Sequence, residues 1–189
     1  IREAVKIAMQ ILSKEFVCAQ DIKELENSSW LKSHRCSFDM LGEASRNQFQ
    51  SDAYFESYLE AINSIGRINS AHDLSNGISI KLSALYSKYD ALHEREVKGF
   101  LLPRLRDLVV EASLQNVSVT IDAEEQDRLS LSLSIIAELA LDPLIKGWPK
   151  LGLAVQAYGK RSPQVIDHLA QLVQQRETMH VRLVKGAYW

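Results

Sequence analysis

Five short segments of the chain alternate between apolar and polar positions with a period of two. They lie at residues 36–40, 78–82, 117–123, 151–157 and 180–184. Such alternation is typical of a β-strand, which presents successive side chains to opposite faces. Each segment carries one charged or amide residue near its downstream end, on the face opposite its apolar residues: Asp39, Lys81, Asp122, Gln156 and Arg182. The pattern therefore predicts five strands, each with one apolar and one polar face.

Apolar residues at helical spacing fill the stretches before and between these strands. The predicted helices cover residues 1–17, 54–65, 92–115 and 129–141, and a last one starts near residue 162. We expect Gly66 to end the second helix and Pro103 to kink or restart the third. Ser162 is expected to cap the last helix, with Pro163 at its first position.

Strands that alternate with helices indicate βα units and a parallel sheet. An open doubly wound sheet is the competing architecture, but its strands are usually apolar on both faces because both faces meet helices. The polar face of these segments favours a barrel, whose chemistry lies at the C-terminal ends of the strands. The five charged or amide residues fall at those ends.

Composition excludes several classes of protein. The chain has 189 residues, 46% of them hydrophobic and 24% charged, which is typical of a globular protein with one sizeable core. A formal charge of −2 gives no electrostatic reason to expect nucleic acid as a partner. Apolar runs are soon broken by charged or amide residues, so neither a signal peptide nor a membrane span is predicted, and a cytoplasmic location is the default.

Two common kinds of cofactor site also find no support in the sequence. The eight glycines form neither GxGxxG nor GxxxxGK[ST], which disfavours a Rossmann fold and a phosphate-binding P-loop. The two cysteines and five histidines show no metal-ligand spacing, so we expect no metal site.

Lys81 and Arg182 are the candidate cations of the polar face. Lys81 lies between two apolar residues, where an unpaired ammonium would be costly, so it needs an anion. Asp122, Asp39 and a substrate carboxylate are the three candidates. Arg182 offers a permanent planar charge that suits a carboxylate, a phosphate or an anionic ring, and an interior ion pair is its structural alternative.

Asp122 is followed closely by Glu124 and Glu125, which places three carboxylates at one strand end. They can serve as metal ligands, as an acid–base pair or as groups that cap the following helix and pair with Arg128. Asp122 would be buried inside the barrel, where a carboxylate needs a partner, so a functional role is favoured for it.

Five motifs together resemble the proline dehydrogenase family, and most of all the bacterial bifunctional proline utilization enzymes. They are Phe38-Asp-Met-Leu-Gly-Glu-Ala44, Gly77-Ile-Ser-Ile-Lys-Leu-Ser-Ala-Leu85, Ile121-Asp-Ala-Glu-Glu125, Val155-Gln-Ala-Tyr158 and Val181-Arg-Leu-Val-Lys-Gly-Ala-Tyr-Trp189. The resemblance implies an α/β fold, the (β/α)8 TIM-type barrel. Residues 1–33 would form a helical lead-in segment, and residues 34–189 would supply the first five strands of an incomplete barrel.

The resemblance also implies an activity. Such enzymes bind FAD and oxidise L-proline to Δ1-pyrroline-5-carboxylate by hydride transfer to flavin N5, and the electrons pass to a membrane quinone. A separate aldehyde dehydrogenase domain of the same longer chain would complete the conversion to glutamate. The full-length protein would be cytoplasmic, with peripheral association with the inner membrane.

Roles for individual residues follow from the same resemblance. Lys81 would pair with the proline carboxylate, and Asp122 would hold Lys81 beside the substrate and the flavin. Gln156 would hydrogen-bond the flavin ring, and Arg182 would lie by flavin N5. Glu43 resembles the family's gate residue at the substrate site. The remaining contacts would come from Val184, Gly186 and Ala187 along the cofactor, from Tyr188 at the proline pocket and from Trp189 against the flavin.

Two alternatives stay open. A barrel aldolase could use Lys81 or Lys185 as a Schiff-base amine. The chain could also be an inactive fragment, because it opens without a methionine and ends after its fifth strand. Five strands would leave a barrel edge unpaired, so we expect the chain to be part of a longer polypeptide and to be unstable alone.

Overall fold

Five parallel strands form one sheet in the computed structural model, which describes residues 2–13, 19, 22–25, 31, 34–176 and 178–186. The strands are β1 (Ser37–Asp39), β2 (Gly77–Ile80), β3 (Ser118–Ile121), β4 (Leu151–Gln156) and β5 (His180–Val184). They lie side by side in their order along the chain. All five predicted strands are therefore confirmed, and an order without reversal is not that of a doubly wound sheet. Within the described residues the sheet does not close, since β1 and β5 each pair on one side.

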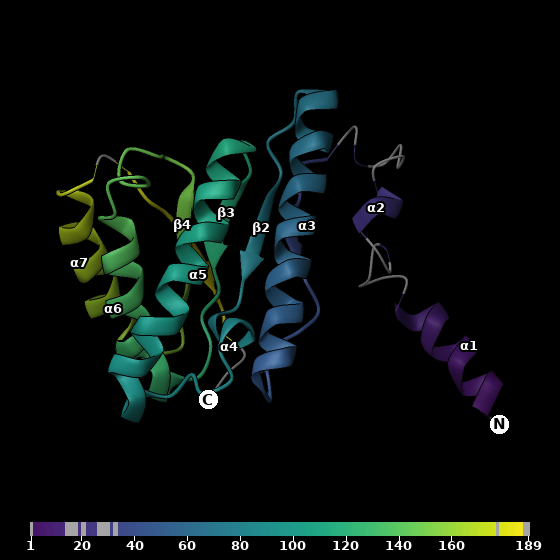
Figure 1. The fold of residues 1–189 in the computed structure, drawn as a ribbon, viewed down its shortest axis with the longest axis horizontal. Coiled ribbons are helices and arrows are strands. Elements are labelled where there is room, and N and C mark those ends of the chain that lie inside the picture. Colours follow the sequence, from purple (N-terminus) through teal and green to yellow (C-terminus); the bar gives the residue numbers. More distant parts are fainter. Residues whose placement is uncertain are drawn as a thin grey trace.

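The helices cover one face of this sheet. Figure 1 shows the four longer helices that follow β1, β2, β3 and β4 arranged side by side along the sheet, with the N-terminal helix apart from it. They are α1 (Arg2–Ser13), α2 (Ile22–Leu25), α3 (Gln48–His72), α4 (Leu82–Leu85), α5 (Glu94–Leu114), α6 (Leu129–Ala140) and α7 (Ser162–Val173), with short 3-10 turns η2 (Ala91–His93) and η3 (Gln126–Arg128). The amphipathic α1 was predicted, and its apolar residues Val5, Ile11 and Leu12 are exposed.

The expected helix end at Gly66 is wrong. Helix α3 continues through Gly66 to His72 and is closed by Asp73, which takes a left-handed conformation with φ 50° and donates its N–H to the Asn69 carbonyl. A Cβ at residue 66 would lie 2.7 Å from Oε1 of Gln115. This glycine therefore serves a close approach of the segment that follows α5, and it does not end the helix.

Two other expectations about helix boundaries also need correction. Pro103 lies inside α5, which runs as one helix, so the expected restart is wrong, while the alternative of a kink stays a prediction. The buried apolar side of α5, which includes Leu101, Leu105 and Leu108, holds the helix against the core despite the hydrogen bond that proline cannot donate. Ser162 is the first residue of α7, after its N-cap Arg161, and its hydroxyl donates to the Ala157 carbonyl at 3.4 Å.

The core lies between the helices and the apolar face of the sheet. Its residues come from three strands and five helices, and they include Ile78, Ile80, Val119, Ile121, Leu151, Leu153, Tyr58, Ile62, Leu82, Leu105, Ile135 and Leu169. The same face of β5 is less covered, because no helix among the described residues follows that strand. Its side chains Val181 and Leu183 are 41% and 65% exposed. The opposite, polar face of the sheet carries the candidate site.

Candidate functional site

Lys81 joins two carboxylates at the C-terminal ends of the first three strands. Asp39 is the last residue of β1, while Lys81 directly follows β2 and Asp122 directly follows β3. Nζ of Lys81 donates to Oδ1 of Asp39 at 2.6 Å and to Oδ2 of Asp122 at 3.1 Å. Of the three anions that the sequence left open for Lys81, the structure therefore brings both aspartates to it.

Burial and charge oppose each other in this group. The side chains of Lys81 and Asp122 are 11% and 13% exposed, whereas that of Asp39 is 57% exposed. Burial alone would lower the pKa of Lys81, but its hydrogen bond to Asp39 and the charge of Asp122 raise that pKa above its ordinary value. Burial raises the pKa of Asp122, against the effect of Lys81 and Arg182. We take Asp122 as ionised at neutral pH because both of its oxygens accept from cations.

Arg182 reaches this group from two strands away. It is the third residue of β5, and its guanidinium forms an ion pair with Oδ1 of Asp122, the residue that directly follows β3. Ala154 of β4 lies opposite Arg182 in the register, and its methyl side chain leaves room for the crossing. Arg182 also donates to the hydroxyl oxygens of Ser79 at 3.0 Å and Ser37 at 3.3 Å. A side chain of β5 thus contacts β1, β2 and β3, so the polar face is concave, as expected for the inside of a barrel.

A second side chain of β5, that of His180 two residues before Arg182, also reaches over β4 to β3. His180 places Nε2 3.1 Å from Oγ1 of Thr120 on β3. Gly152 of β4 lies between them, and a Cβ there would be 2.3 Å from Nε2 of His180. Burial lowers the pKa of His180, and the charges of Arg182 and Arg176 add to that effect. A neutral imidazole therefore lies next to the Arg182 layer and adds no positive charge to it.

Gln156 and Glu124 connect the ends of β3 and β4. Nε2 of Gln156 donates to the backbone carbonyl of Glu124 at 2.8 Å, and Oε1 of Glu124 accepts from the Ser83 N–H at 3.1 Å. Burial raises the pKa of Glu124. The expectation that Glu124 caps the following helix is therefore wrong, since its carboxylate accepts from the first turn of α4. The predicted pair between Glu125 and Arg128 is confirmed at 3.0 Å.

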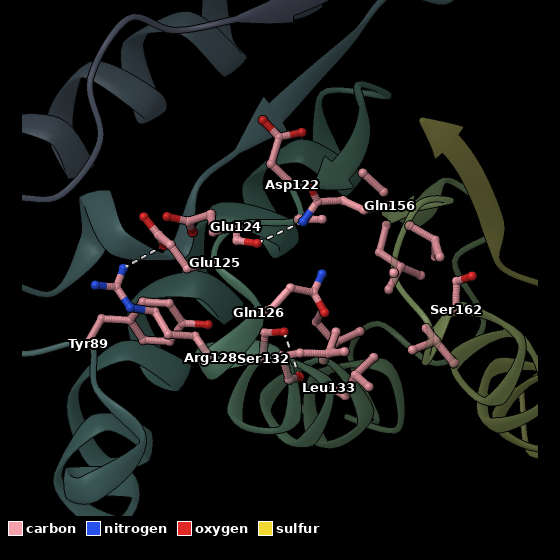
Figure 2. A pocket seen from close by; sticks show the side chains of 18 residues that line it. Tyr89, Asp122, Glu124, Glu125, Gln126, Arg128, Ser132, Leu133, Gln156 and Ser162 are labelled. Carbon is pink, nitrogen blue, oxygen red and sulfur yellow. Dashed lines mark hydrogen bonds and ion pairs between the residues drawn. The ribbon is translucent and has the colours of Figure 1, made fainter. Parts of the chain in front are cut away.

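Figure 2 shows a small crevice beside these loops, between the ends of β3 and β4 and the helix α6. Tyr89, Gln126 and Ser132 are among the residues that line it. The Asp122 side chain points away from the middle of the crevice in this view. Asp122 is nevertheless among the residues that line the crevice, so the crevice borders the ion-paired group. The part of the chain that the structure describes contains no group of three or more His, Cys, Asp or Glu side chains arranged to hold a metal ion.

The other predicted site residues are spread around this edge. Val184 pairs with Gln156 across β4 and β5. Gly186 takes φ 110°, and a Cβ there would lie 2.1 Å from Cδ1 of Tyr158. Glu43 is exposed in the loop between β1 and α3. Ala187, Tyr188 and Trp189 lie outside the described residues.

Sequence reasoning missed three polar partners of the cations. Tyr58 lies in the helix predicted at residues 54–65, and its hydroxyl oxygen accepts from the backbone N–H of Lys81 at 3.1 Å. Burial raises the pKa of Tyr58 to about 12, so the phenol stays protonated. Ser37 and Ser79 share a strand face with Asp39 and Lys81, and this parity was the available signal for them.

Comparison with known proteins gives a consistent result. The family model described as Proline dehydrogenase matches residues 18–189. Over 195 aligned residues and 100% of this chain, the sequence is 42% identical to the bifunctional protein PutA of Escherichia coli (strain K12). Proline dehydrogenase 1 of Bacillus subtilis (strain 168) is 29% identical over 152 residues, which cover 80% of this chain.

Solved structures give the same result for the fold. A bifunctional proline utilization A protein superposes on 90% of the chain with a TM-score of 0.82 and 41% identity. Proline utilization A from Bdellovibrio bacteriovorus, inactivated by N-propargylglycine, covers 99% of the chain with a TM-score of 0.89 and 27% identity. The matched regions are 18% and 21% of those two chains. The chain likewise spans 15% of the Escherichia coli protein and 43% of the Bacillus one.

Proposed function

The chain belongs to the proline dehydrogenase family, and from this premise we propose that it supplies part of a site that oxidises L-proline to Δ1-pyrroline-5-carboxylate with FAD as the electron acceptor. The observation that carries the proposal is the continuous group of Lys81, Asp122 and Arg182 on the polar face of the sheet. It offers one cation to a substrate carboxylate and a second, permanent cation beside it.

The donors of this group fit an amino acid and a flavin. Lys81 uses two of its three N–H groups on Asp39 and Asp122, and the third has no partner among the described residues. Arg182 donates three hydrogen bonds, so two of its five N–H groups have no partner in the part of the chain that the structure describes. These open donors suit a carboxylate at Lys81 and the acceptor atoms of a flavin ring at Arg182. Gln156, Val184 and Gly186 would hold the same cofactor, together with Ala187, Tyr188 and Trp189.

In the proposed mechanism FAD, when bound, would supply the acceptor for the hydride that leaves C5 of proline. Lys81 binds the proline carboxylate, and Asp122 fixes the ammonium of Lys81 from the side. The substrate amine enters unprotonated, so that its lone pair can form the C=N bond as the hydride departs. Arg182 keeps a fixed positive charge at the site, which Asp122, Ser79 and Ser37 hold in one orientation. Glu43, in the β1–α3 loop, would close the substrate side.

Further parts of the proposal concern partners beyond these residues. The names of the bifunctional relatives support a second activity in a longer polypeptide, and we propose the aldehyde dehydrogenase domain for it. A membrane quinone would take up the electrons from a cytoplasmic protein that associates peripherally with the inner membrane. No helix of the described residues has the length and apolar character needed to cross a bilayer.

For Lys81, one of the two lysines named for the aldolase alternative, the charge state disfavours that chemistry. A Schiff-base lysine needs a neutral amine, which enzymes obtain by lowering the lysine pKa. The two carboxylates around Lys81 raise its pKa instead. Trapping with borohydride in the presence of an aldehyde or keto acid should therefore leave Lys81 unmodified.

The test of the proposed function uses the full-length protein that contains this chain. We expect the purified protein to bind flavin and its visible absorbance to bleach when L-proline is added without oxygen. Pyrrolidine, which lacks the carboxylate, should bleach it far more slowly, because Lys81 then has no anion to orient. A flavin-containing protein that L-proline does not reduce would contradict the proposed activity, and a protein that binds no flavin would favour an inactive fragment.

A further inference from the structure

Asp39 already accepts one hydrogen bond from the Lys81 ammonium, the group that an incoming carboxylate would bind. We propose that Asp39 is an exchangeable counter-ion: it holds the Lys81 ammonium when the site is empty and competes with the substrate carboxylate for it. This inference deepens the proposed function and rests on it, because it takes Lys81 as the group that binds the carboxylate.

The two anions on Lys81 differ in how firmly they are held. Asp122 is buried, and its two oxygens are shared between Lys81 and Arg182. Asp39 is 57% exposed, and among the described residues Lys81 is its only hydrogen-bond partner. An exposed carboxylate of this kind can exchange its partner for water at little cost, whereas moving Asp122 would leave two cations without their shared anion. Asp39 is therefore the carboxylate that can move away from Lys81.

The balance of charge explains why a ligand carboxylate would replace Asp39 at Lys81. Lys81 and Arg182 are matched by Asp39 and Asp122, so the four side chains together carry no net charge. A carboxylate ligand would add a negative charge next to two aspartates. If Asp39 turns into the solvent, the ligand replaces one carboxylate by another and the balance at Lys81 is kept. The affinity of the site for a carboxylate ligand then depends on how much more strongly Lys81 binds that ligand than it binds Asp39.

The experiment measures binding without turnover. The probe is cyclopentanecarboxylate, a ring acid of the size of proline that has no amine to oxidise, titrated calorimetrically into the full-length protein. We expect the dissociation constant to fall about three- to tenfold in Asp39→Asn, because the competing charge is gone while the side chain keeps its shape. Asp39→Glu keeps the negative charge, so its dissociation constant for cyclopentanecarboxylate should stay close to that of the wild-type protein. Cyclopentanecarboxamide, which is uncharged, should not gain affinity in Asp39→Asn.

Asp52 provides a matched control. Its carboxylate is 54% exposed and contacts Arg104 at 2.6 Å, the same distance that separates Asp39 from Lys81, but it lies on α3. Asp52→Asn should leave the dissociation constant unchanged. Equal or weaker binding of cyclopentanecarboxylate to Asp39→Asn, or no binding to the wild-type protein, would overturn the proposal. Because calorimetry requires no oxidation, a failure of L-proline to bleach the flavin would count against the proposed function and not against this inference.

Discussion

Arg182 on β5 and Asp122, directly after β3, form an ion pair across β4, the strand between them. Ala154 lies on β4 directly opposite Arg182, and Gly152 occupies the same position under His180. Two small residues on β4 therefore let two long side chains of β5 reach β3. Arg182 thereby joins the polar side chains of the inner face, which include Ser79 of β2 and Ser37 of β1. The site thus depends on residues of β4 that carry no functional group.

Ala154→Leu tests this dependence. A larger side chain would fill the path of Arg182, separate it from Asp122 and cost about 1–3 kcal/mol through overpacking. We expect the rate of flavin reduction by L-proline to fall at least about tenfold, equivalent to about 1.4 kcal/mol in the barrier. Stopped-flow reduction of the full-length protein checks the rate. Ala71→Leu, at an exposed position of α3, is the control and should reduce at the wild-type rate.

Lys81→Met removes the ammonium and keeps most of the apolar stem. Asp122 then retains only Arg182, and the substrate carboxylate loses its partner. We expect kcat/KM for L-proline to fall about 100-fold or more, since removing one member of a buried charge pair costs at least about 2–3 kcal/mol. Lys88→Met removes an exposed lysine that pairs with Glu96 at 3.0 Å and should change kcat/KM less than about twofold. Equal losses in the two variants would point to a general effect of charge.

The strands were predictable because each one repeats apolar residues with a period of two, and this local pattern agrees with the final packing. The sequence also selected Lys81 and Asp122, since charges among buried apolar residues need partners. It could not select between Asp39 and Asp122 for Lys81. That choice depends on strand order and register, which place Asp39, Lys81 and Asp122 on three neighbouring strands.

The wrong or incomplete expectations concern residues whose role depends on a contact with a distant part of the chain. Gly66 has the features of a helix end, but the helix continues because Gln115 packs against it. Tyr58 fits an apolar stripe and is buried, but its hydroxyl also accepts from the backbone of Lys81. Gly66 and Gln115 lie 49 positions apart, and Tyr58 and Lys81 lie 23 positions apart, so neither contact has a local signal in the sequence.

Gly186→Ala should destabilise the segment that follows β5. The backbone of Gly186 has φ 110°, which an alanine adopts only with strain of about 1–3 kcal/mol, and the new methyl group would overlap the Tyr158 ring. We expect a lower melting temperature and weaker flavin binding. Adding Tyr158→Ala should recover the part of the loss that comes from the overlap and leave the part that comes from φ.

Gly99→Ala is the matched control for Gly186→Ala. Gly99 lies on the exposed side of α5, and a Cβ there would meet nothing within 4 Å. Alanine in a helix is favoured over glycine by about 1 kcal/mol, so this variant should raise the melting temperature. A Gly186→Ala protein that melts with the wild-type protein would contradict the conformation of Gly186 described above.

His180→Gln should make the protein less sensitive to mild acid. The folded state lowers the pKa of His180, first by burial and then through the charges of Arg182 and Arg176. In the unfolded chain the imidazole binds a proton near its ordinary pKa of about 6.5. Between that value and the lowered one the unfolded state holds more protons, so the stability present above about pH 6.5 is lost as the pH falls toward the folded-state pKa.

The variant His180→Gln removes this titration, because glutamine cannot titrate, and its amide can keep the hydrogen bond to Thr120. Thermal melts of the full-length protein at about pH 7.5 and about pH 5.5, about one unit on each side of the ordinary histidine pKa, should show a smaller drop in melting temperature for His180→Gln than for the wild-type protein. His72→Gln, at a half-buried position near the end of α3, should follow the wild-type protein at both values. An equal drop in all three proteins would show that other groups carry the acid sensitivity.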